Sequence, residues 1–241
     1  MDVKDLVNKI NQKKYNEVIN LSENFLKKEK NYLIYNIYGI ALQKTLRFKE
    51  SIKAFKKSLI LKKKNLDAMN NLANSYSMEK DYVSSEKMFK EIFKINPNFF
   101  ISLLNYSNLK LELMIFDEAI ENYKKALINS PSKFYKINIL FKLCSAYEAI
   151  GSFENVRECA NKILFLDTNN VTAHSIISKL NDYSSNLLNL EEMINISKID
   201  SLSDGELIDL NFALGKAYED QKNFEESYKF YMKANKIKKK K

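Results

Sequence analysis

A 34-residue period runs through the chain and constrains its fold more than any other feature of the sequence. Phe48, Tyr82 and Phe116 lie 34 residues apart, Phe153 follows after 37, and Phe224 follows after a further 71. Two other series run in step with these aromatic residues. One is aromatic (Phe55, Phe89, Tyr123, Tyr231) and the other holds small or compact residues (Gly39, Ala73, Ser107, Cys144, Gly215). Such a period is typical of proteins that stack one supersecondary unit many times.

Within each period the apolar residues follow the spacing of two helices. Tyr35, Tyr38 and Leu42 recur at intervals of three to four and predict one helix face. After the residues around Phe48, a second face carries Ser51, Ile52, Phe55, Ser58 and Leu59. The chain has only 4 Gly and 2 Pro, which favours short turns between helices over a sheet sandwich. Because a lone helix hairpin cannot bury its apolar face, we expect neighbouring hairpins to stack.

The composition excludes several classes of protein. Hydrophobic residues make up 45% of the chain, which argues against disorder, and no apolar run is long enough to predict a membrane span. The N-terminal residues are polar and lack the apolar core of a signal peptide, so we expect a cytoplasmic protein. Two cysteines and one histidine predict neither a disulfide framework nor a zinc site, and we expect Cys144 and Cys159 to be structural thiols.

The formal net charge of +9 is unevenly distributed. Residues 1–65 carry 16 basic against 6 acidic residues, residues 66–232 carry 17 against 24, and residues 233–241 carry 6 lysines. Basic ends leave open a module that binds nucleic acid or an anionic membrane. The acidic middle would repel a polyanion along the molecule, so we favour solvated lysines and expect no nucleic acid partner.

The repeating units resemble the tetratricopeptide repeat. That family combines an aromatic residue, a Leu-Gly pair, a Tyr, an Ala, a second aromatic residue and a closing Pro over 34 residues. The clearest match is "LNFALGKAYEDQKNFEESYKFYMKANKIK" near the C-terminus, and Pro97 and Pro131 close two earlier units. The resemblance implies an all-α, right-handed superhelical solenoid of antiparallel helix hairpins. It also implies a non-catalytic scaffold that binds a protein or peptide ligand in a concave groove.

The period divides the chain into one solenoid, 1–241, of about six hairpins. Its predicted parts are a partial repeat (1–31), four repeats (32–65, 66–99, 100–133 and 137–170), a degenerate repeat (171–207) and a last repeat (208–241). The degenerate repeat lacks the usual aromatic anchor. Within it we expect Leu187, Leu188, Leu190 and Met193 to form a shifted second helix, and His174 to be packed or exposed rather than catalytic. Ser203 and Glu206 predict a capping box that opens the last repeat.

Asparagines give the best binding signal. In stacked hairpins of this type the first helix of each repeat lines the groove, and an amide offers both a donor and an acceptor to an extended peptide backbone. Because the chain is rich in asparagine throughout, composition alone is the alternative explanation. No glycine-rich phosphate loop, nucleophile motif or metal spacing is present, and we expect no enzyme activity and no cofactor. The predicted groove residues are Asn36, Asn70, Asn71, Asn74, Asn105, Asn108 and Lys142.

The last repeat also resembles the junction of bacterial proteins that join tetratricopeptide repeats to a sulfotransferase. The similar segments are Phe212 to Asp220, the Ala234–Asn235 pair and the closing lysines, Lys236 to Lys241. The resemblance implies that this chain is the repeat portion of a longer protein, either as a scaffold or as a substrate-positioning part of a sulfotransferase. A homodimer through a terminal repeat is a further expectation, since Tyr228, Tyr231 and Met232 remain apolar without a following cap.

Overall fold

The structure is a computed structural model that describes residues 3–185 and 187–240. These residues form 14 helices and no strand, and they fall into two compact units, Met1–Leu113 and Met114–Lys241. The predicted fold class, all-α with antiparallel helix hairpins, is confirmed. Each unit is described separately below.

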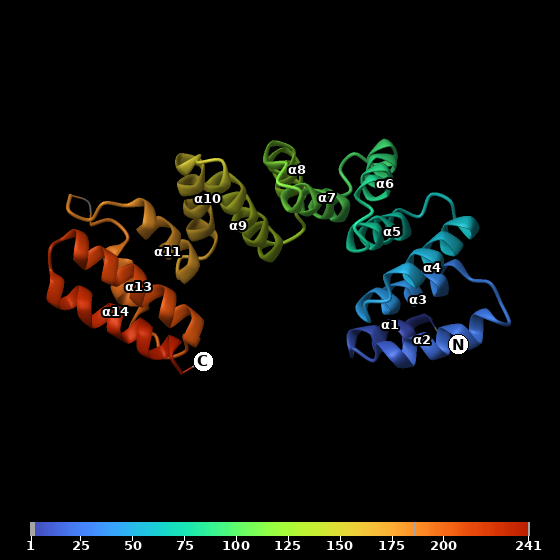
Figure 1. The fold of residues 1–241 in the computed structure, drawn as a ribbon, viewed down its shortest axis with the longest axis horizontal. Helices are drawn as coiled ribbons and strands as arrows, with labels where there is room; N and C mark the ends of the chain where they lie inside the picture. The colour runs from blue at the N-terminus through green and yellow to red at the C-terminus, as the bar shows by residue number, and fades with distance from the viewer. Residues whose placement is uncertain (1–2, 186, 241) are drawn as a thin grey trace. The chain divides into compact units, whose positions relative to one another are not determined.

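Unit 1 is a series of helix hairpins. The second helix of each hairpin also packs against the first helix of the next, as seen for α2 with α3 and for α4 with α5 (Figure 1). Polar residues begin several of these helices, because a side-chain oxygen can accept from the free N–H groups of the first turn. Asn31, for example, accepts from the backbone N–H of Leu33 at 2.9 Å. The helices are α1 (Val3–Asn11), α2 (Tyr15–Leu26), α3 (Tyr32–Lys44), α4 (Phe48–Leu61), α5 (Leu66–Met78), α6 (Tyr82–Ile95) and α7 (Phe100–Glu112).

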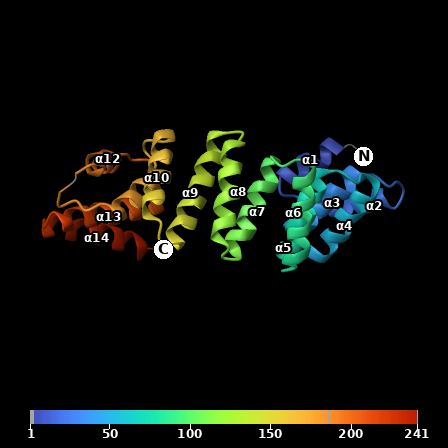
Figure 2. The ribbon, with the colours of Figure 1, turned by 90° about the horizontal axis from the view of Figure 1, so that it is seen from above.

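Unit 2 continues with hairpins but contains one irregular segment. Helices α9 and α10 form one hairpin, and α13 and α14 form another, in which the two helices lie side by side (Figures 1 and 2). Ser203 and Glu206 form the predicted capping box at the start of α13, with both reciprocal hydrogen bonds present. The helices are α8 (Phe116–Ile128), α9 (Lys133–Ala149), α10 (Phe153–Leu166), α11 (Val171–Leu180), α12 (Leu190–Ile196), α13 (Asp204–Asp220) and α14 (Phe224–Lys238).

A left-handed residue marks the turn inside the regular hairpins. At Leu46, with φ of 62°, the N–H of Leu46 bonds to the carbonyl of Gln43 and the N–H of Arg47 bonds to that of Leu42. This pair of bonds satisfies carbonyls that the helix end would leave free. The equivalent residues with positive φ are Lys13, Lys80, Met114, Gly151 and Lys222. These residues recur with the same spacing as the aromatic series, so each regular hairpin has the same turn at the same position of the repeat.

Gly151 provides a test of this turn. We expect Gly151→Ala to lower the free energy of unfolding by about 1 kcal/mol, because φ is +70° and an L side chain there is strained. A Cβ at Gly151 would meet nothing within 4 Å, so backbone strain is the only expected cost. Gly205→Ala, in the first turn of α13, is the matched control and should cost nothing. Urea denaturation followed by circular dichroism measures both, and equal midpoints would refute the turn assignment.

The small residues of the repeat lie under aromatic rings. A Cβ built on Gly39 would lie 2.5 Å from Cε1 of Phe55, and one on Gly215 would lie 2.6 Å from the ring of Tyr231. Phe55 is fully buried between α3 and its neighbours. The sequence therefore places glycine where the partner ring of the second helix leaves no room for a methyl group.

We expect Gly39→Leu to lower the free energy of unfolding by about 1–3 kcal/mol through overpacking. Phe55 would have to leave its place, and it lies in the middle of the α3–α4 hairpin. Chemical denaturation measures the loss. Gly39→Leu combined with Phe55→Leu makes room and should recover part of it, whereas additive losses would argue against the ring contact.

The hairpin of α9 and α10 packs thiols in place of an aromatic ring. Cys144 occupies the small-residue position of α9, and Ala160 stands where other repeats carry the second aromatic residue. Both cysteines are free and buried, as expected. The hydrogen bond with Cys159, followed by burial, raises the pKa of the Cys144 thiol, so this thiol stays protonated at neutral pH.

The segment 171–207 departs from the hairpin pattern. Helix α12 has only 7 residues and begins at Leu190, and Leu187 and Leu188 are exposed in the connection before it. The prediction that these two leucines belong to a second helix is wrong. The aromatic anchor is not lost either, since Tyr183 from the connection is fully buried in a cluster with Val171, Met193 and Leu214.

Candidate functional site

The first helices of unit 1 form one face. Helix α3 contacts α5, and α5 contacts α7, so the predicted groove residues of three repeats lie on neighbouring helices. Asn71 donates from Nδ2 to Oδ1 of Asn36 at 3.2 Å, and Asn105 donates to Oδ1 of Asn70 at 3.0 Å. The asparagines one repeat apart therefore link the helices to each other.

Gln43 is a further linking residue, which sequence reasoning missed. Its Nε2 donates to the backbone oxygen of Asn71 at 2.8 Å and to Oγ of Ser75 at 2.6 Å. Gln43 joins α3 to α5 two turns along α3 from Asn36. Its position seven residues after Asn36, on the same side of the helix, was the available signal.

A pocket of about 440 Å³ opens beside these links, on the side of the hairpin turns. It brings together Asn74, Asn105 and Asn108 from α5 and α7. Leu46 and Met78, which are 75% and 60% exposed, give it an apolar edge. The pocket therefore combines amide groups with a small apolar surface, which is the usual composition of a ligand pocket.

Four predicted residues do not line this pocket: Asn36, Asn70, Asn71 and Lys142. Asn70 is only 4% exposed, and its Oδ1 accepts from Ser102 at 2.9 Å as well as from Asn105, so it is an internal link between α5 and α7. Lys142 is exposed on α9 in unit 2. The six asparagines thus share one unit, and Lys142 does not belong to it.

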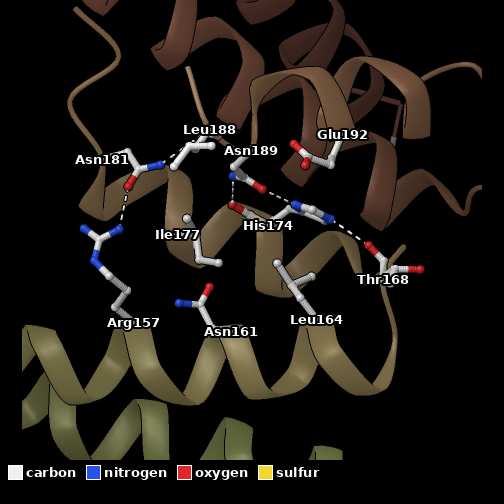
Figure 3. A pocket seen from close by; sticks show the side chains of 10 residues that line it. All are labelled: Arg157, Asn161, Leu164, Thr168, His174, Ile177, Asn181, Leu188, Asn189 and Glu192. Carbon is white, nitrogen blue, oxygen red and sulfur yellow. Dashed lines mark hydrogen bonds between the residues drawn. The ribbon is translucent and has the colours of Figure 1, made fainter. Parts of the chain in front are cut away.

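A second pocket, of about 600 Å³, lies in unit 2 beside the irregular segment. Figure 3 shows its wall: Arg157, Asn161 and Leu164 project from α10, and Ile177 and His174 belong to α11. The connection to α12 covers the other side with Leu188 and Asn189, and Glu192 stands on α12.

Hydrogen bonds from α10 and α13 hold the connection in place. Arg157 donates from Nη1 to Oδ1 of Asn181 at 2.5 Å and from Nη2 to the carbonyl of Leu180 at 2.7 Å. Lys216 on α13 donates to the carbonyl of Asn181 at 2.7 Å, and the backbone N–H of Tyr183 donates to Asp220 at 3.2 Å. The connection is irregular in backbone but fixed at its first residues.

His174 fixes the end of the same connection. Its imidazole is 2% exposed, with Nδ1 against Oδ1 of Asn189 and Nε2 against the carbonyl of Thr168 at 2.8 Å. The amide of Asn189 donates to the carbonyl of His174 and to the hydroxyl of Tyr183, each at 3.2 Å. The side chain of His174 is thus packed and hydrogen bonded at both nitrogens, and it connects α11 to the start of α12.

Metal and membrane features are not found among residues 3–185 and 187–240. No group of three or more His, Cys, Asp or Glu side chains within these ranges is placed to hold a metal ion. In the same ranges, no helix is both long enough and apolar enough to cross a membrane.

Comparison with known proteins agrees with this architecture. The family model described as tetratricopeptide repeat matches residues 208–241, and no curated protein matches the sequence. The C-terminal part of a TPR repeat-containing protein from Cytophaga hutchinsonii superimposes with a TM-score of 0.76 at 12% identity, over 98% of this chain and 95% of that one. A tetratricopeptide repeat protein from Parabacteroides merdae gives 0.60 at 13% identity, over 98% and 91%. The pilF protein of Pseudomonas aeruginosa gives 0.58 at 14% identity, over 94% and 99%.

The fold and the linked asparagine face define a helical-repeat scaffold. Residues 208–241 match the tetratricopeptide repeat, and the fold is that of tetratricopeptide-repeat proteins.

Proposed function

We propose that the chain is a non-catalytic scaffold that binds an extended polypeptide on the first-helix face of unit 1. The observation that carries this proposal is the pocket where Asn74 and Asn108 stand one repeat apart beside the exposed side chains of Leu46 and Met78. Amides at this spacing suit the repeating donors and acceptors of a peptide backbone, and the apolar edge suits one side chain of the ligand.

The packing of unit 1 supports a ligand on this face. Helix α5 contacts both α3 and α7, whereas no contact of that size joins α4 to α6 among the described residues. In a curved stack of hairpins, the helices of the inner layer lie closer together than those of the outer layer, so α3, α5 and α7 form the inner layer. The asparagines that link α3, α5 and α7 also hold this layer rigid, and a rigid site loses less entropy when it binds.

The links also divide the predicted residues by role. Asn36, Asn70, Asn71 and Asn105 use side-chain atoms to join helices. We assign ligand contact first to Asn74 and Asn108, because they line the pocket one repeat apart, and positioning to the other four. Lys142 is left out, because it lies in unit 2.

A display library of random dodecapeptides, selected on the full chain, tests the proposal. Selected peptides are titrated calorimetrically into the wild type and the Asn74→Ala and Asn108→Ala variants. Loss of one amide hydrogen bond should weaken binding about 3- to 12-fold. Asn138→Ala, an exposed asparagine on α9, is the matched control and should bind as the wild type does. Equal affinity for all four proteins would contradict the assignment.

The likeness of the last repeat to the sulfotransferase junction supports a second candidate function. In it the chain belongs to a longer protein of that type, in bacteria, and positions a substrate for the linked enzyme. An immunoblot of source cells with an antibody against residues 1–241 tests this. A band well above 28.2 kDa, with sulfuryl transfer by the longer form, supports it, and a single band at 28.2 kDa refutes it.

Exposed apolar side chains on α14 support a homodimer through the last repeat. Phe224, Tyr228 and Met232 are 66%, 65% and 50% exposed and lie four residues apart, on one side of the helix. Light scattering of the wild type and Tyr228→Glu tests it. A dimer mass that the substitution halves is expected, and a monomeric wild type contradicts it.

A further inference from the structure

We propose that the pocket in unit 2 binds the side chain of an arginine or lysine presented by a polypeptide partner. This site is separate from the asparagine face of unit 1 and does not depend on it. Four features of the pocket carry the inference: its apolar wall, the exposed carboxylate of Glu192, its oxygen acceptors and the reason it is open.

The wall suits the stem of a long basic side chain. Leu164 of α10, Ile177 of α11 and Leu188 of the connection face the pocket (Figure 3). Arginine and lysine bury their methylene groups against such surfaces while the charged head stays at a polar edge. A volume of about 600 Å³ is more than one such side chain needs, so adjoining backbone of the partner also has room.

One carboxylate of the pocket wall is available to a cation. The two charged lining residues, Arg157 and Glu192, are of opposite sign. Arg157 donates to the neutral oxygens of Asn181 and Leu180 and keeps its positive charge, whereas Lys162, on α10, pairs with Glu158 at 2.6 Å. Glu192 is exposed and has no ion-pair partner among the described residues. A cation that enters the pocket therefore meets an available carboxylate.

The remaining polar groups add oxygen acceptors. The side chain of Asn161 points from α10 into the pocket, and Thr168 stands at its far end (Figure 3). Arginine and lysine heads are donors only, so an amide oxygen and a hydroxyl complement them. The binding of Arg157 by Leu180 and Asn181 shows that this connection already accepts guanidinium donors within the chain.

The pocket is open because the degenerate repeat lacks a regular second helix. Helix α12 has 7 residues, whereas α10 before it and α14 after it have 14 and 15. A second helix of that length would pack along α11, but α12 contacts α11 only weakly. The irregularity at 171–207 therefore creates a surface that the regular repeats do not have.

Short peptides test the proposal on the full chain. The probes are acetylated, amidated heptapeptides of glycine and serine with a central arginine, lysine or citrulline. Citrulline keeps the shape of arginine and removes its charge. His174 is the only histidine of the sequence and lies in the pocket wall, so its ring NMR signals report binding without a label.

We expect saturable shifts of the His174 signals with the arginine and lysine peptides. Affinity for the arginine peptide should fall about three- to fivefold with citrulline or with Glu192→Gln, as for a partly exposed ion pair. Asp117→Asn, an exposed acid of α8 that does not line the pocket, should change nothing, and neither should Asn74→Ala. Absence of shifts, equal binding of citrulline, or equal binding by a Glu192→Gln protein with the wild-type melting temperature would each overturn the proposal.

Discussion

Replacing Phe55 by alanine is expected to lower the free energy of unfolding by about 3–5 kcal/mol. Phe55 is fully buried, and its ring lies against Gly39 in the α3–α4 hairpin. Glycine offers no side chain to fill the space that the ring would leave, so the cavity persists. Urea denaturation followed by circular dichroism at a helix wavelength measures the loss.

Phe165→Ala is the matched control for this substitution. Phe165 is also on a second helix but is 88% exposed, so its removal should change stability by no more than about 0.5 kcal/mol. A Phe55→Ala variant as stable as the Phe165→Ala variant would show that the second aromatic series is not the core of the repeat.

Replacing Tyr183 by alanine is expected to cost about 3–5 kcal/mol as well, which only the structure reveals. Tyr183 is fully buried although it lies in a connection and not in a helix. Its ring fills the cluster with Leu190, Met193 and Leu210, and its hydroxyl receives a hydrogen bond from Asn189. The same denaturation experiment measures the effect.

Tyr183→Phe separates the ring from the hydroxyl. It keeps the packing and removes one hydrogen-bond partner of Asn189, so we expect a loss of about 0.5–1.5 kcal/mol. If Tyr183→Ala costs no more than Tyr183→Phe, then the ring does not anchor the irregular segment.

Most of the regular repeats were predictable because one physical constraint recurs along the chain. Gly39 and Gly215 are small since an aromatic ring of the facing helix occupies the space of their side chains, and those rings form the 34-residue series. The hairpin turns obey the same period through their left-handed residues, such as Leu46 and Lys80. The sequence carries both ends of each contact, so the register could be read from it.

The segment around Tyr183 was not predictable, because its contacts do not recur along the sequence. Its backbone is fixed by single long-range hydrogen bonds, from Arg157, Lys216 and His174, which have no period and no local motif. Leu187 and Leu188 resemble part of a helix face in the sequence. Asn189 has a left-handed conformation, with φ of 75°, and α12 begins only after it, at Leu190. The pocket of unit 2 is formed by these contacts, so it could not be predicted from the sequence either.

The asparagine face was only partly predictable. The period placed the six asparagines on first helices, and the structure adds that Asn71 contacts Asn36 and that Asn105 contacts Asn70. Spacing did not indicate that these amides satisfy one another, because their hydrogen bonds depend on side-chain rotation. The assignment of ligand contact to Asn74 and Asn108 stays a prediction.

Hydrogen–deuterium exchange of the full chain, with and without a selected peptide, tests the proposed binding face most directly. The account predicts slower exchange on binding in α3, α5 and α7, with α4 and α6 unchanged. Protection confined to α4 and α6, or to unit 2, would contradict the proposal that the first-helix face of unit 1 holds the ligand.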